Sequence, residues 1–535
     1  MNIRELPLVR KWITRRHDLV AIGRNTLTLI RVESTTLSKI VPLVFVLAIA
    51  TGIRLWNLNQ IGYNSDEAVY AGQASAIAQA PLLKDIFPVF RAHPLLFQFA
   101  LALIFQFGVS DIGGRLLAVT IGVITVYLVF RLGSLLYGEN TGLLAALFLA
   151  LMPYHVVVTR QVLLDGPLVL CSTLSLYLLA RFSKTEDPLW LHATGMGMGL
   201  TFLAKETGII LLGAIYAFFA LSSEIRVRIK DLALSIALMA IMIAPFPVSL
   251  WLAGVSRTGQ QYFVWQLFRR PNHTWDFYLD VVPQAIGILV IVLAILGLWY
   301  MREQRTWREK LLTLWILVPV LFFQIWPTKG FQYLLPIAPA FAVLASRTLV
   351  RWTTANKHVI LLGRQFSITL VKTIVIGIVV FSLLISSWQS IQTGKSGAFI
   401  AGTGGVPGGR ETGVWIKENV PAGATLLTIG PSMANILQFY GHHKALGLSV
   451  SLNPLHRNPS YQPVNNPDFQ IRTNEIQYLV WDSFSAERSP FFADKLIQLA
   501  MRFNGRVAHT ESITITQEDG TTIEKPVIII YKVHP

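Results

Sequence analysis

Long apolar segments recur along the first three quarters of the chain and alternate with short polar segments. Each is long enough, or nearly so, to cross a hydrocarbon layer of roughly 30 Å as a helix. The segments lack the alternation of apolar and polar residues that is typical of membrane β-barrels. The pattern therefore predicts a polytopic α-helical membrane protein with about eleven spans. The expected spans are residues 39–56, 113–136, 141–159, 166–182, 189–205, 207–222, 232–253, 281–301, 311–326, 333–350 and 367–389.

The positions of the basic residues decide the expected orientation of these spans. Cations are concentrated in residues 1–38 and in alternate loops further along, and cytoplasmic loops carry an excess of Lys and Arg. The apolar segment 93–108 is short, and the later basic loops all fall on one side only if this segment does not cross. We therefore expect a cytoplasmic N-terminus in a plasma (inner) membrane, a membrane domain over residues 39–389, and large outer loops at 57–112 and 254–280.

Beyond the last span the chain changes in character. Residues 390–410 are rich in glycine and are expected to form a linker. Residues 411–535 mix strand-like runs such as ATLLTIG (424–430) with a helix-like run, SPFFADKLIQLAMRF (489–503). This mixture predicts a small α/β domain. An odd number of spans places that domain outside the cytoplasm.

Composition narrows the class of protein further. The chain is 53% hydrophobic and 14% charged, whereas soluble proteins carry about 25% charged residues. The net charge of +16 is attributed to cytoplasmic loops and to cations that meet an anionic substrate, so no nucleic-acid partner is expected. The single cysteine, Cys171, gives no disulfide framework. No glycine-rich phosphate loop opens a helix.

An acidic pair, Asp66-Glu67, follows the first span in the sequence YNSDEAVY (63–70). Two interpretations stay open at this point. The pair can stabilise a helix N-terminus that is capped by Asn64 or Ser65, since carboxylates are favoured in the first turn. It can also be catalytic, because ionisable groups are costly at a bilayer boundary and are therefore usually functional there.

The expected topology brings further polar residues to the same outer face. They are Arg91, His93, Arg115, Arg160, Asp165, Lys205, Arg269, Arg270, His273, Lys329 and Tyr333. Local explanations exist for several of them, such as an ion pair between Arg160 and Asp165 or contacts of Arg269 and Arg270 with lipid phosphates.

As a group these residues favour one chemistry. Cations beside apolar grooves suit a lipid phosphate, and carboxylates beside them suit a hydroxyl that loses its proton. The arrangement favours transfer of a sugar from a polyprenyl phosphate to an acceptor. The alternative is a transporter or flippase for a lipid-linked or anionic substrate, which should carry ionisable or broken-helix features near the bilayer midplane.

Several motifs occur in a fixed order along residues 39–390. They are Asp66-Glu67, Arg91-Ala92-His93-Pro94, GGRLLAV (113–119), RQVLLDGP (160–167), LAKE (203–206) and KGFQYLLP (329–336). Together they resemble the protein O-mannosyltransferase and lipid A aminoarabinose transferase superfamily (glycosyltransferase family 39-like), which has the GT-C fold. One departure is that His93-Pro94 is followed by Leu95, where the family usually has a second proline.

The resemblance implies roles for individual residues. Asp66 would be the catalytic base, with Glu67 supporting it or orienting the acceptor and with Asp165 as a second acidic residue at the site. Arg91, Arg115, Lys205 and Lys329 would contact the donor phosphate. His93, Arg160, Arg269, Arg270 and Tyr333 are expected to bind the donor phosphate or substrate because they share that face.

The resemblance also implies the reaction and its partners. The donor would be a dolichyl or undecaprenyl phosphate carrying a hexose or pentose, and the transfer would invert the anomeric centre. The acceptor stays open between a lipid, a glycan and a protein. A divalent metal ion also stays open as a cofactor, with Glu67 and His273 as candidate ligands. A bacterial or archaeal source is expected.

Overall fold

The structure is a computed structural model of the chain, which describes residues 40–87, 89, 93–254, 256–269, 271–300, 302–304, 306–352, 358–361, 364–392, 406–516 and 521–534. It divides into two compact units, residues 1–49 and 50–535, and each is described by itself. The described part of the first unit is the beginning of the helix Ile40–Leu55. All sites discussed below lie in the second unit.

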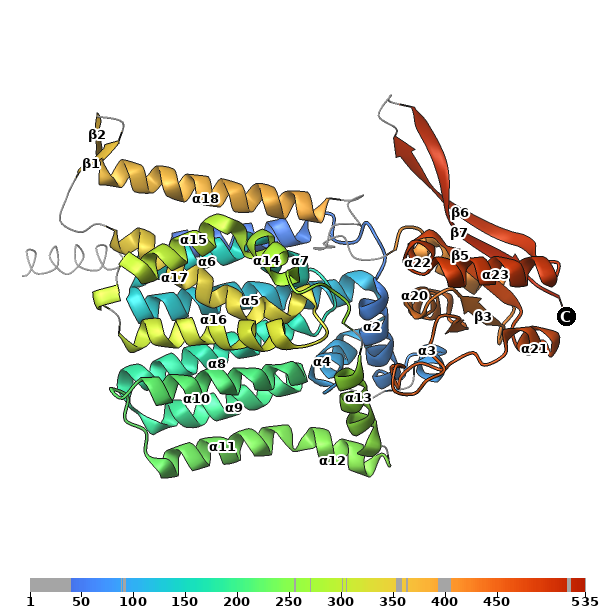
Figure 1. The fold of residues 1–535 in the computed structure, drawn as a ribbon, viewed down its shortest axis with the longest axis horizontal. Coiled ribbons are helices and arrows are strands. Elements are labelled where there is room, and N and C mark those ends of the chain that lie inside the picture. The colour runs from blue at the N-terminus through green and yellow to red at the C-terminus, as the bar shows by residue number, and fades with distance from the viewer. Residues whose placement is uncertain are drawn as a thin grey trace, which may run out of the picture. The chain divides into compact units, whose positions relative to one another are not determined.

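Helices that run side by side, most of them long and joined by short helical turns, form most of the second unit (Figure 1). In chain order they are α5 (Asp111–Tyr137), α6 (Glu139–Leu151), α7 (Pro153–Val158), α8 (Asp165–Thr185), α9 (Pro188–Ala204), η2 (Glu206–Ile210), α10 (Leu211–Leu221), α11 (Ile229–Ile243), α12 (Pro245–Leu252), α14 (Phe277–Val282), η3 (Pro283–Gly287), α15 (Ile288–Tyr300), η4 (Arg302–Gln304), α16 (Trp307–Ile325), η5 (Phe331–Ile337), α17 (Ala338–Arg351) and α18 (Ile368–Ile391). A short hairpin of β1 (His358–Leu361) and β2 (Arg364–Ser367) precedes α18. These helices correspond to the apolar segments that the sequence marks as spans.

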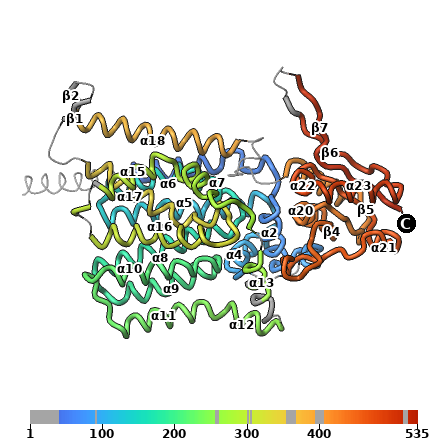
Figure 2. The backbone as a smooth tube through the Cα atoms, viewed as in Figure 1, coloured from blue at the N-terminus to red at the C-terminus, as the bar shows by residue number. Residues whose placement is uncertain are grey.

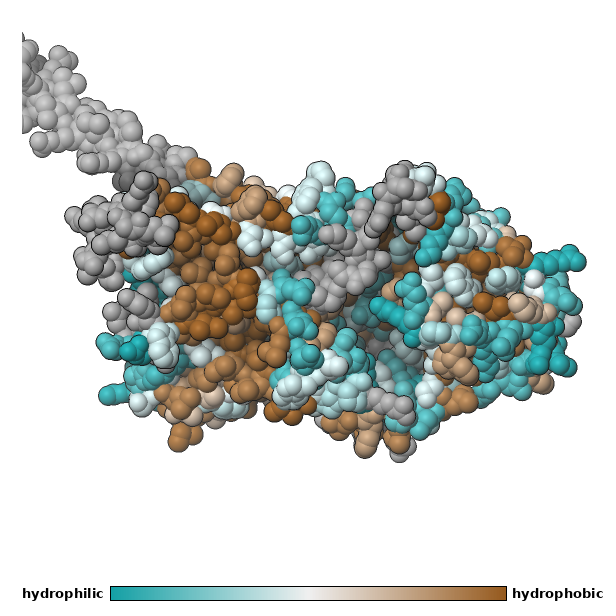
Figure 3. Space-filling view, turned by 45° about the horizontal axis from the view of Figure 1, so that its top comes forward, coloured by the Kyte–Doolittle hydropathy of each residue, from teal (hydrophilic) through white to brown (hydrophobic). Residues whose placement is uncertain are grey.

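Among the described residues, six helical stretches are long and apolar enough to cross a membrane. They are Asp111–Tyr137, Asp165–Thr185, Ile229–Leu252, Phe277–Trp299, Phe331–Arg351 and Ile368–Ile391. Other expected spans are shorter or interrupted; one new helix begins at Pro153 because proline cannot donate the hydrogen bond that would continue the preceding helix. Apolar side chains gather over the helices (Figure 3). A polytopic helical membrane protein is therefore supported, and the count of eleven spans stays a prediction.

Four shorter helices lie at one end of this bundle, beside the C-terminal residues (Figure 1). They are α2 (Ser65–Ile77), α3 (Leu83–Ile86), α4 (Leu96–Phe105) and α13 (Ser256–Phe268). With ten residues, α4 rises only about 15 Å, which is half of what a crossing needs. This length agrees with an interfacial position for the segment 93–108.

The C-terminal residues form a five-stranded mixed sheet in the order β4-β3-β5-β7-β6 (Figure 2). The first three strands in this order are parallel, and β7 and β6 are antiparallel to their neighbours. The strands are β3 (Thr425–Thr428), β4 (Lys444–Gly447), β5 (Tyr478–Asp482), β6 (Arg506–Thr516) and β7 (Thr522–Lys532). The helices are α19 (Gly409–Asn419), α20 (Pro431–Gly441), α21 (Pro467–Arg472), α22 (Ser483–Arg488) and α23 (Pro490–Arg502).

One hydrophobic core joins this sheet region to the helices at the end of the bundle. It contains Tyr63 and Ala68 beside Leu101 of α4, together with Leu437 and Phe439 of α20, and all five are buried. Burial of apolar area contributes roughly 25 cal/mol per Å². The helix that carries Asp66 is therefore packed from both the bundle and the sheet region.

A polar latch, defined as Tyr440, Asp111, Arg410 and the backbone at Tyr63, lies at the edge of this core. The Tyr440 hydroxyl donates to Asp111 Oδ2 at 2.5 Å and accepts from the backbone N–H of Tyr63 at 2.7 Å. Arg410 Nη1 lies 3.4 Å from the same carboxylate oxygen. A Cβ at Gly62 would lie 2.6 Å from the Cβ of Arg410, so this close approach requires glycine.

A buried carboxylate, Asp482, closes β5 and caps α22. Its side chain is fully buried, and one carboxylate oxygen accepts a hydrogen bond from the backbone N–H of Ser485 at 2.7 Å. The other oxygen has no partner among the described residues. Burial raises the pKa of the Asp482 carboxyl to about 6. The folded protein therefore holds a proton on Asp482 more tightly than the unfolded chain does.

We expect Asp482→Asn to raise the apparent melting temperature at pH 8 and to raise it by roughly half as much at pH 5. The folded pKa of about 6 exceeds the ordinary value of 3.8, so stability falls as pH rises between these values. Above them the folded state holds a buried charge at a cost on the order of 3 kcal/mol. Asparagine still caps the helix but stays neutral. Thermal unfolding in detergent at both pH values measures the difference.

The exposed Asp494→Asn of α23 is the matched control and should have no effect at either pH. An equal gain at pH 5 and pH 8 would show that the charge of Asp482 is not the cause.

Candidate active site

The N-terminus of α2 presents the acidic pair through a capping box. Asn64 Oδ1 accepts a hydrogen bond from the backbone N–H of Glu67 at 2.9 Å, and Glu67 Oε2 accepts from the backbone N–H of Asn64 at 3.0 Å. Of the two caps that the sequence leaves open, Asn64 is therefore the one used. Asp66 lies in the first turn, where the helix dipole favours a carboxylate.

The carboxylate of Glu67 is fully occupied by the protein. Oε1 accepts from Arg115 Nε and from the backbone N–H of Val162, both at 3.0 Å. Oε2 accepts from Arg115 Nη2 at 2.9 Å in addition to the Asn64 N–H. A carboxylate has about four acceptor positions, and Glu67 is completely buried. Glu67 therefore has no position left for a metal ion or a substrate, and we propose a positioning role for it.

The guanidinium of Arg115 is occupied in the same way. Besides its two bonds to Glu67, Nη1 donates to the carbonyls of Leu58 at 2.9 Å and Ile61 at 2.7 Å, and Nη2 donates to the carbonyl of Gly62 at 2.9 Å. All five N–H donors of an arginine are then used. We therefore propose that Arg115 holds the loop before α2 in place, where the sequence predicted a contact with the donor phosphate.

Asp66 differs from Glu67 in having no such partners. Its carboxylate makes no hydrogen bond or ion pair to any residue that the structure describes, and it is accessible to solvent. The surrounding protein nevertheless removes enough water to raise the pKa of Asp66 above its ordinary value; the charge of Lys205 acts against this rise, and Asp165 adds to it. Asp66 is thus a free carboxylate beside other charged groups.

A second carboxylate near Asp66 is already paired. Lys205 Nζ donates to both oxygens of Asp165, at 2.9 and 3.0 Å, and both side chains are buried. The same ammonium lies 5.2 Å from the centre of the Tyr333 ring. Asp165 is therefore paired with Lys205 and not with Arg160, whose Nη2 donates to the carbonyl of Trp56 at 2.5 Å.

A chain of polar contacts through α13 links His93 to Arg269, which directly follows that helix. His93 Nδ1 lies 2.8 Å from Glu206 Oε2, and its Nε2 lies 3.1 Å from the Tyr262 hydroxyl. Gln266 Nε2 donates to that hydroxyl at 2.8 Å and its carbonyl accepts from Arg269 Nη1 at 3.3 Å. The charge of His93 also acts to lower the pKa of Asp66. α13 is thereby connected to the catalytic candidates.

Lys329 and His273 lie near each other on neighbouring loops. The backbone N–H of Lys329 donates to Asn272 Oδ1 at 2.8 Å, and its ammonium lies 5.9 Å from the Trp275 ring. His273 stacks on Phe277 with ring centres 4.0 Å apart. Within the described part of the chain, no group of three or more His, Cys, Asp or Glu side chains is placed to hold a metal ion. The proposed ligand pair of Glu67 and His273 has no support from this geometry.

Two of the predicted residues, Arg91 and Arg270, lie outside the described residues. Three residues that the sequence did not mark as site residues adjoin the others. They are Glu206, Tyr262 and Tyr461, and Tyr461 lies close enough to Asp66 and Arg269 for their charges to act on it. The motif LAKE contained Glu206, whereas no local signal distinguished Tyr262 or Tyr461.

Two comparisons of the sequence with known proteins find similarity to dolichyl-phosphate-mannose-protein mannosyltransferases. A family model described as dolichyl-phosphate-mannose-protein mannosyltransferase matches residues 92–251. The chain is similar to dolichyl-phosphate-mannose–protein mannosyltransferase 4 of Saccharomyces cerevisiae, with 32% identity over 104 residues. These residues are 18% of this chain and 14% of the yeast protein, so the match spans a small part of that relative.

Two groups of solved structures share the fold over most of the chain. ArnT from Cupriavidus metallidurans, in the apo state and bound to undecaprenyl phosphate, has a TM-score of 0.66 at 16% identity, over 91% of this chain and 97% of that chain. The oligosaccharyltransferase AglB from Archaeoglobus fulgidus has a TM-score of 0.58 at 12% identity, over 91% and 74%. At these identities the likeness shows the fold, and it confirms the resemblance to GT-C proteins that the sequence motifs indicated.

Proposed function

We propose that the protein is a glycosyltransferase that moves a sugar from a polyprenyl phosphate to a hydroxyl or phosphate acceptor, with inversion and with Asp66 as general base. One observation supports this role above all others. Of the carboxylates gathered here, Glu67 is occupied by Arg115 and Asp165 by Lys205, whereas Asp66 has no partner among the described residues. A free carboxylate in a charged, partly desolvated site suits proton abstraction.

The proposed step is a single displacement. Asp66 takes the proton of the acceptor O–H while the acceptor oxygen forms a bond to the anomeric carbon. The bond between that carbon and the phosphate oxygen breaks, and its electron pair leaves with the polyprenyl phosphate. Positive groups near that oxygen stabilise the charge that develops on it.

We place the phosphate of the sugar donor beside cations whose N–H groups are not all used by the protein. Arg269 uses Nη1 on Gln266, which leaves other N–H groups of its guanidinium for a phosphate. Among the described residues, the ammonium of Lys329 makes one hydrogen bond, to the Trp326 carbonyl, which is long at 3.4 Å. Lys205 and Tyr333 lie next to Asp165 and add a positive charge and a hydroxyl. We propose this group, with His93 and with Arg91 and Arg270, as the phosphate-binding side of the site.

The fold and the charge distribution support the remaining parts of the proposal. ArnT was solved with undecaprenyl phosphate and AglB with dolichol phosphate, so a polyprenyl phosphate is the donor class that fits this fold. The polar cluster lies at one end of the bundle and not at its middle, where a transporter would need it. We propose that this end is extracytoplasmic because the basic loops lie toward the other end.

A test of the function uses the purified full chain in lipid nanodiscs. Undecaprenyl and dolichyl phosphates that carry labelled hexoses or pentoses are supplied together with cell-envelope extract as the acceptor source. We expect one of these donors to be consumed, with release of free polyprenyl phosphate and transfer of the label. If no donor is consumed while the protein moves labelled donor across vesicle membranes, the flippase interpretation replaces ours.

The pH profile gives an independent prediction. A base must be deprotonated to act, and the pKa of Asp66 is raised above 3.8. We therefore expect kcat/KM to fall as pH falls through a midpoint above the ordinary range of an aspartate. Measurement of initial rates from pH 4 to pH 8 locates that midpoint. A value of kcat/KM that stays constant down to pH 4 would contradict the proposal that a carboxyl group with a raised pKa is the base.

A further inference from the structure

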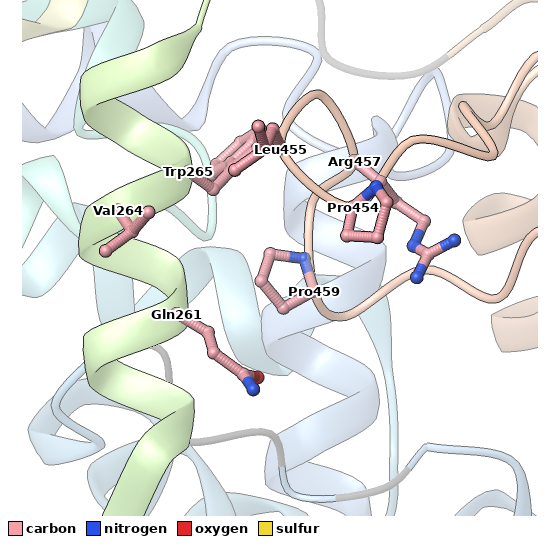
Figure 4. A pocket seen from close by; sticks show the side chains of 7 residues that line it. All are labelled: Gln261, Val264, Trp265, Pro454, Leu455, Arg457 and Pro459. Carbon is pink, nitrogen blue, oxygen red and sulfur yellow. The ribbon is translucent and has the colours of Figure 1, made fainter.

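A pocket of about 460 Å³ lies between α13 and the loop that follows β4 (Figure 4). Val264 and Trp265 form part of one wall, and Pro454, Leu455 and Pro459 form part of the other. This size falls within the range of about 300–1,000 Å³ that is usual for small-molecule sites. The two walls come from distant parts of the chain, and neither wall takes part in the proposed proton transfer.

The walls offer flat apolar faces with hydrogen-bond donors at their edges. Trp265 contributes its ring to the lining of the pocket, whereas its indole N–H is buried away from the surface. Arg457 contributes a guanidinium, of which Nη1 donates to the Leu452 carbonyl at 3.3 Å, and the exposed Gln261 adds an amide.

This combination favours one class of ligand. A sugar ring has apolar C–H faces that pack on aromatic and proline rings, and its rim of hydroxyl and ether oxygens accepts hydrogen bonds. The guanidinium of Arg457 supplies donors only, and the amide of Gln261 supplies both donors and an acceptor. A peptide presents backbone N–H groups that need acceptors in equal number, and this pocket has few. A lipid chain needs no hydrogen-bond partner at all.

The pocket lies near the candidate active site. Tyr461, two residues after Pro459, lies close to Asp66 and Arg269. Trp265 has its ring centre 4.7 Å from the Arg269 guanidinium and 5.3 Å from the Tyr262 ring. A molecule that occupies the pocket therefore lies beside residues that neighbour the free carboxylate.

The two elements that reach the site follow parallel strands. The loop with Tyr461 follows β4, and α20 follows β3; Asn435 of α20 donates to the Ser65 hydroxyl, next to Asp66, at 3.0 Å. The carboxyl ends of parallel strands are where ligands usually bind in open α/β sheets. The sheet region is thus placed to hold a substrate at Asp66.

We propose that this pocket binds a neutral sugar ring of the acceptor, next to the ring or group that receives the transferred sugar. The proposal rests on the proposed function, because it names the acceptor of that same site. It makes the acceptor a glycan or glycoconjugate, with Trp265 as the stacking platform and Arg457 as the main donor to ring oxygens.

The test measures binding without any donor or turnover. The full chain in nanodiscs is titrated with neutral di- to pentasaccharides of gluco, manno and galacto configuration, and with a Ser/Thr-rich decapeptide, by saturation-transfer NMR. We expect at least one oligosaccharide to bind and the peptide not to bind. Trp265→Ala and Arg457→Ala should each raise the Kd about tenfold or more.

Matched variants separate the pocket from the rest of the protein. Phe268→Ala removes an exposed aromatic of the same helix, and Arg506→Ala removes an exposed cation of the sheet region, so both should leave the Kd unchanged. Asp66→Asn should also bind the oligosaccharide normally, even though transfer is lost. Failure of donor consumption with intact sugar binding would thus overturn the proposed function and not the pocket.

Three results would overturn the pocket assignment. One is the absence of binding by every oligosaccharide. Another is sugar binding that Trp265→Ala and Arg457→Ala leave unchanged. The third is binding of the decapeptide that these two variants weaken, which would make the acceptor a protein segment.

Discussion

Asp66→Asn is expected to lower the rate of sugar transfer by roughly two to four orders of magnitude, which is the usual contribution of a general base. Asparagine has nearly the same shape as aspartate, so the capping box of Asn64 and Glu67 and the fold of α2 should persist. The donor phosphate is assigned to cations that Asp66 does not contact. The measurement is the transfer rate at saturating donor, together with the Kd for the donor, which should change little.

Asp85→Asn is the matched control for this variant. Asp85 is an exposed carboxylate on the nearby helix α3, and its loss should leave the rate unchanged. If Asp66→Asn retained full transfer, another group would have to accept the proton, and the assignment of Asp66 as base would fail. If donor binding collapsed together with the rate, Asp66 would be a binding residue.

Arg115→Met is expected to destabilise the protein by about 3–5 kcal/mol, which is the usual effect of removing one partner of a buried ion pair. The substitution leaves the carboxylate of Glu67 without two of its four hydrogen bonds and frees the carbonyls of Leu58, Ile61 and Gly62. Transfer should be lost because the loop before α2 is no longer held, and the apparent melting temperature should fall with it.

The control for this effect is Arg131→Met, which removes an exposed arginine of the same helix, α5. Its contacts to Tyr127 and Tyr177 are on the surface, so the change should stay within about 1 kcal/mol. A stable Arg115→Met protein that has lost only donor affinity would restore the phosphate role that the sequence predicted.

The contrast between Asp66 and Glu67 shows what a sequence can and cannot predict. Their position at the start of a helix follows from Asn64 and the spacing of the capping box, which are local features. Which of the two carboxylates is paired depends on Arg115 and on the backbone N–H of Val162, which are distant from them along the chain. A motif of two adjacent acids therefore pointed to the place of the proposed site. It could not show that, among the described residues, Glu67 is paired and Asp66 is not.

The predicted membrane spans also show which features a sequence pattern can and cannot predict. Long apolar runs located the helices to within a few residues, because burial in lipid imposes the pattern directly. Breaks at Pro153 and Pro245 were not predicted, since one proline inside an apolar run can kink a helix or end it. In the sheet region, β3, β5 and β7 fall on apolar runs, whereas β6 carries too many polar residues to be recognised.

Residues supplied by the C-terminal region were the hardest to predict. Tyr461 and Arg457 lie in a loop rich in proline and asparagine, which resembles any surface loop in sequence. Their importance depends on how the core of Leu437 and Phe439 packs against α2 and α4. Only the tertiary structure shows which loop comes near Asp66.

The latch of Tyr440, Asp111 and Arg410 has a consequence for engineering. A chimaera that exchanges residues 406–535 for those of a relative, in order to change the acceptor, would separate Tyr440 and Arg410 from Asp111 and from the backbone at Tyr63. The grafted segment would then lie against Gly62 without the side chains of Arg410 and Tyr440 that pack there. We therefore expect a stable exchange of residues 406–535 to require that the segment 58–63 and the start of α5 are exchanged with them.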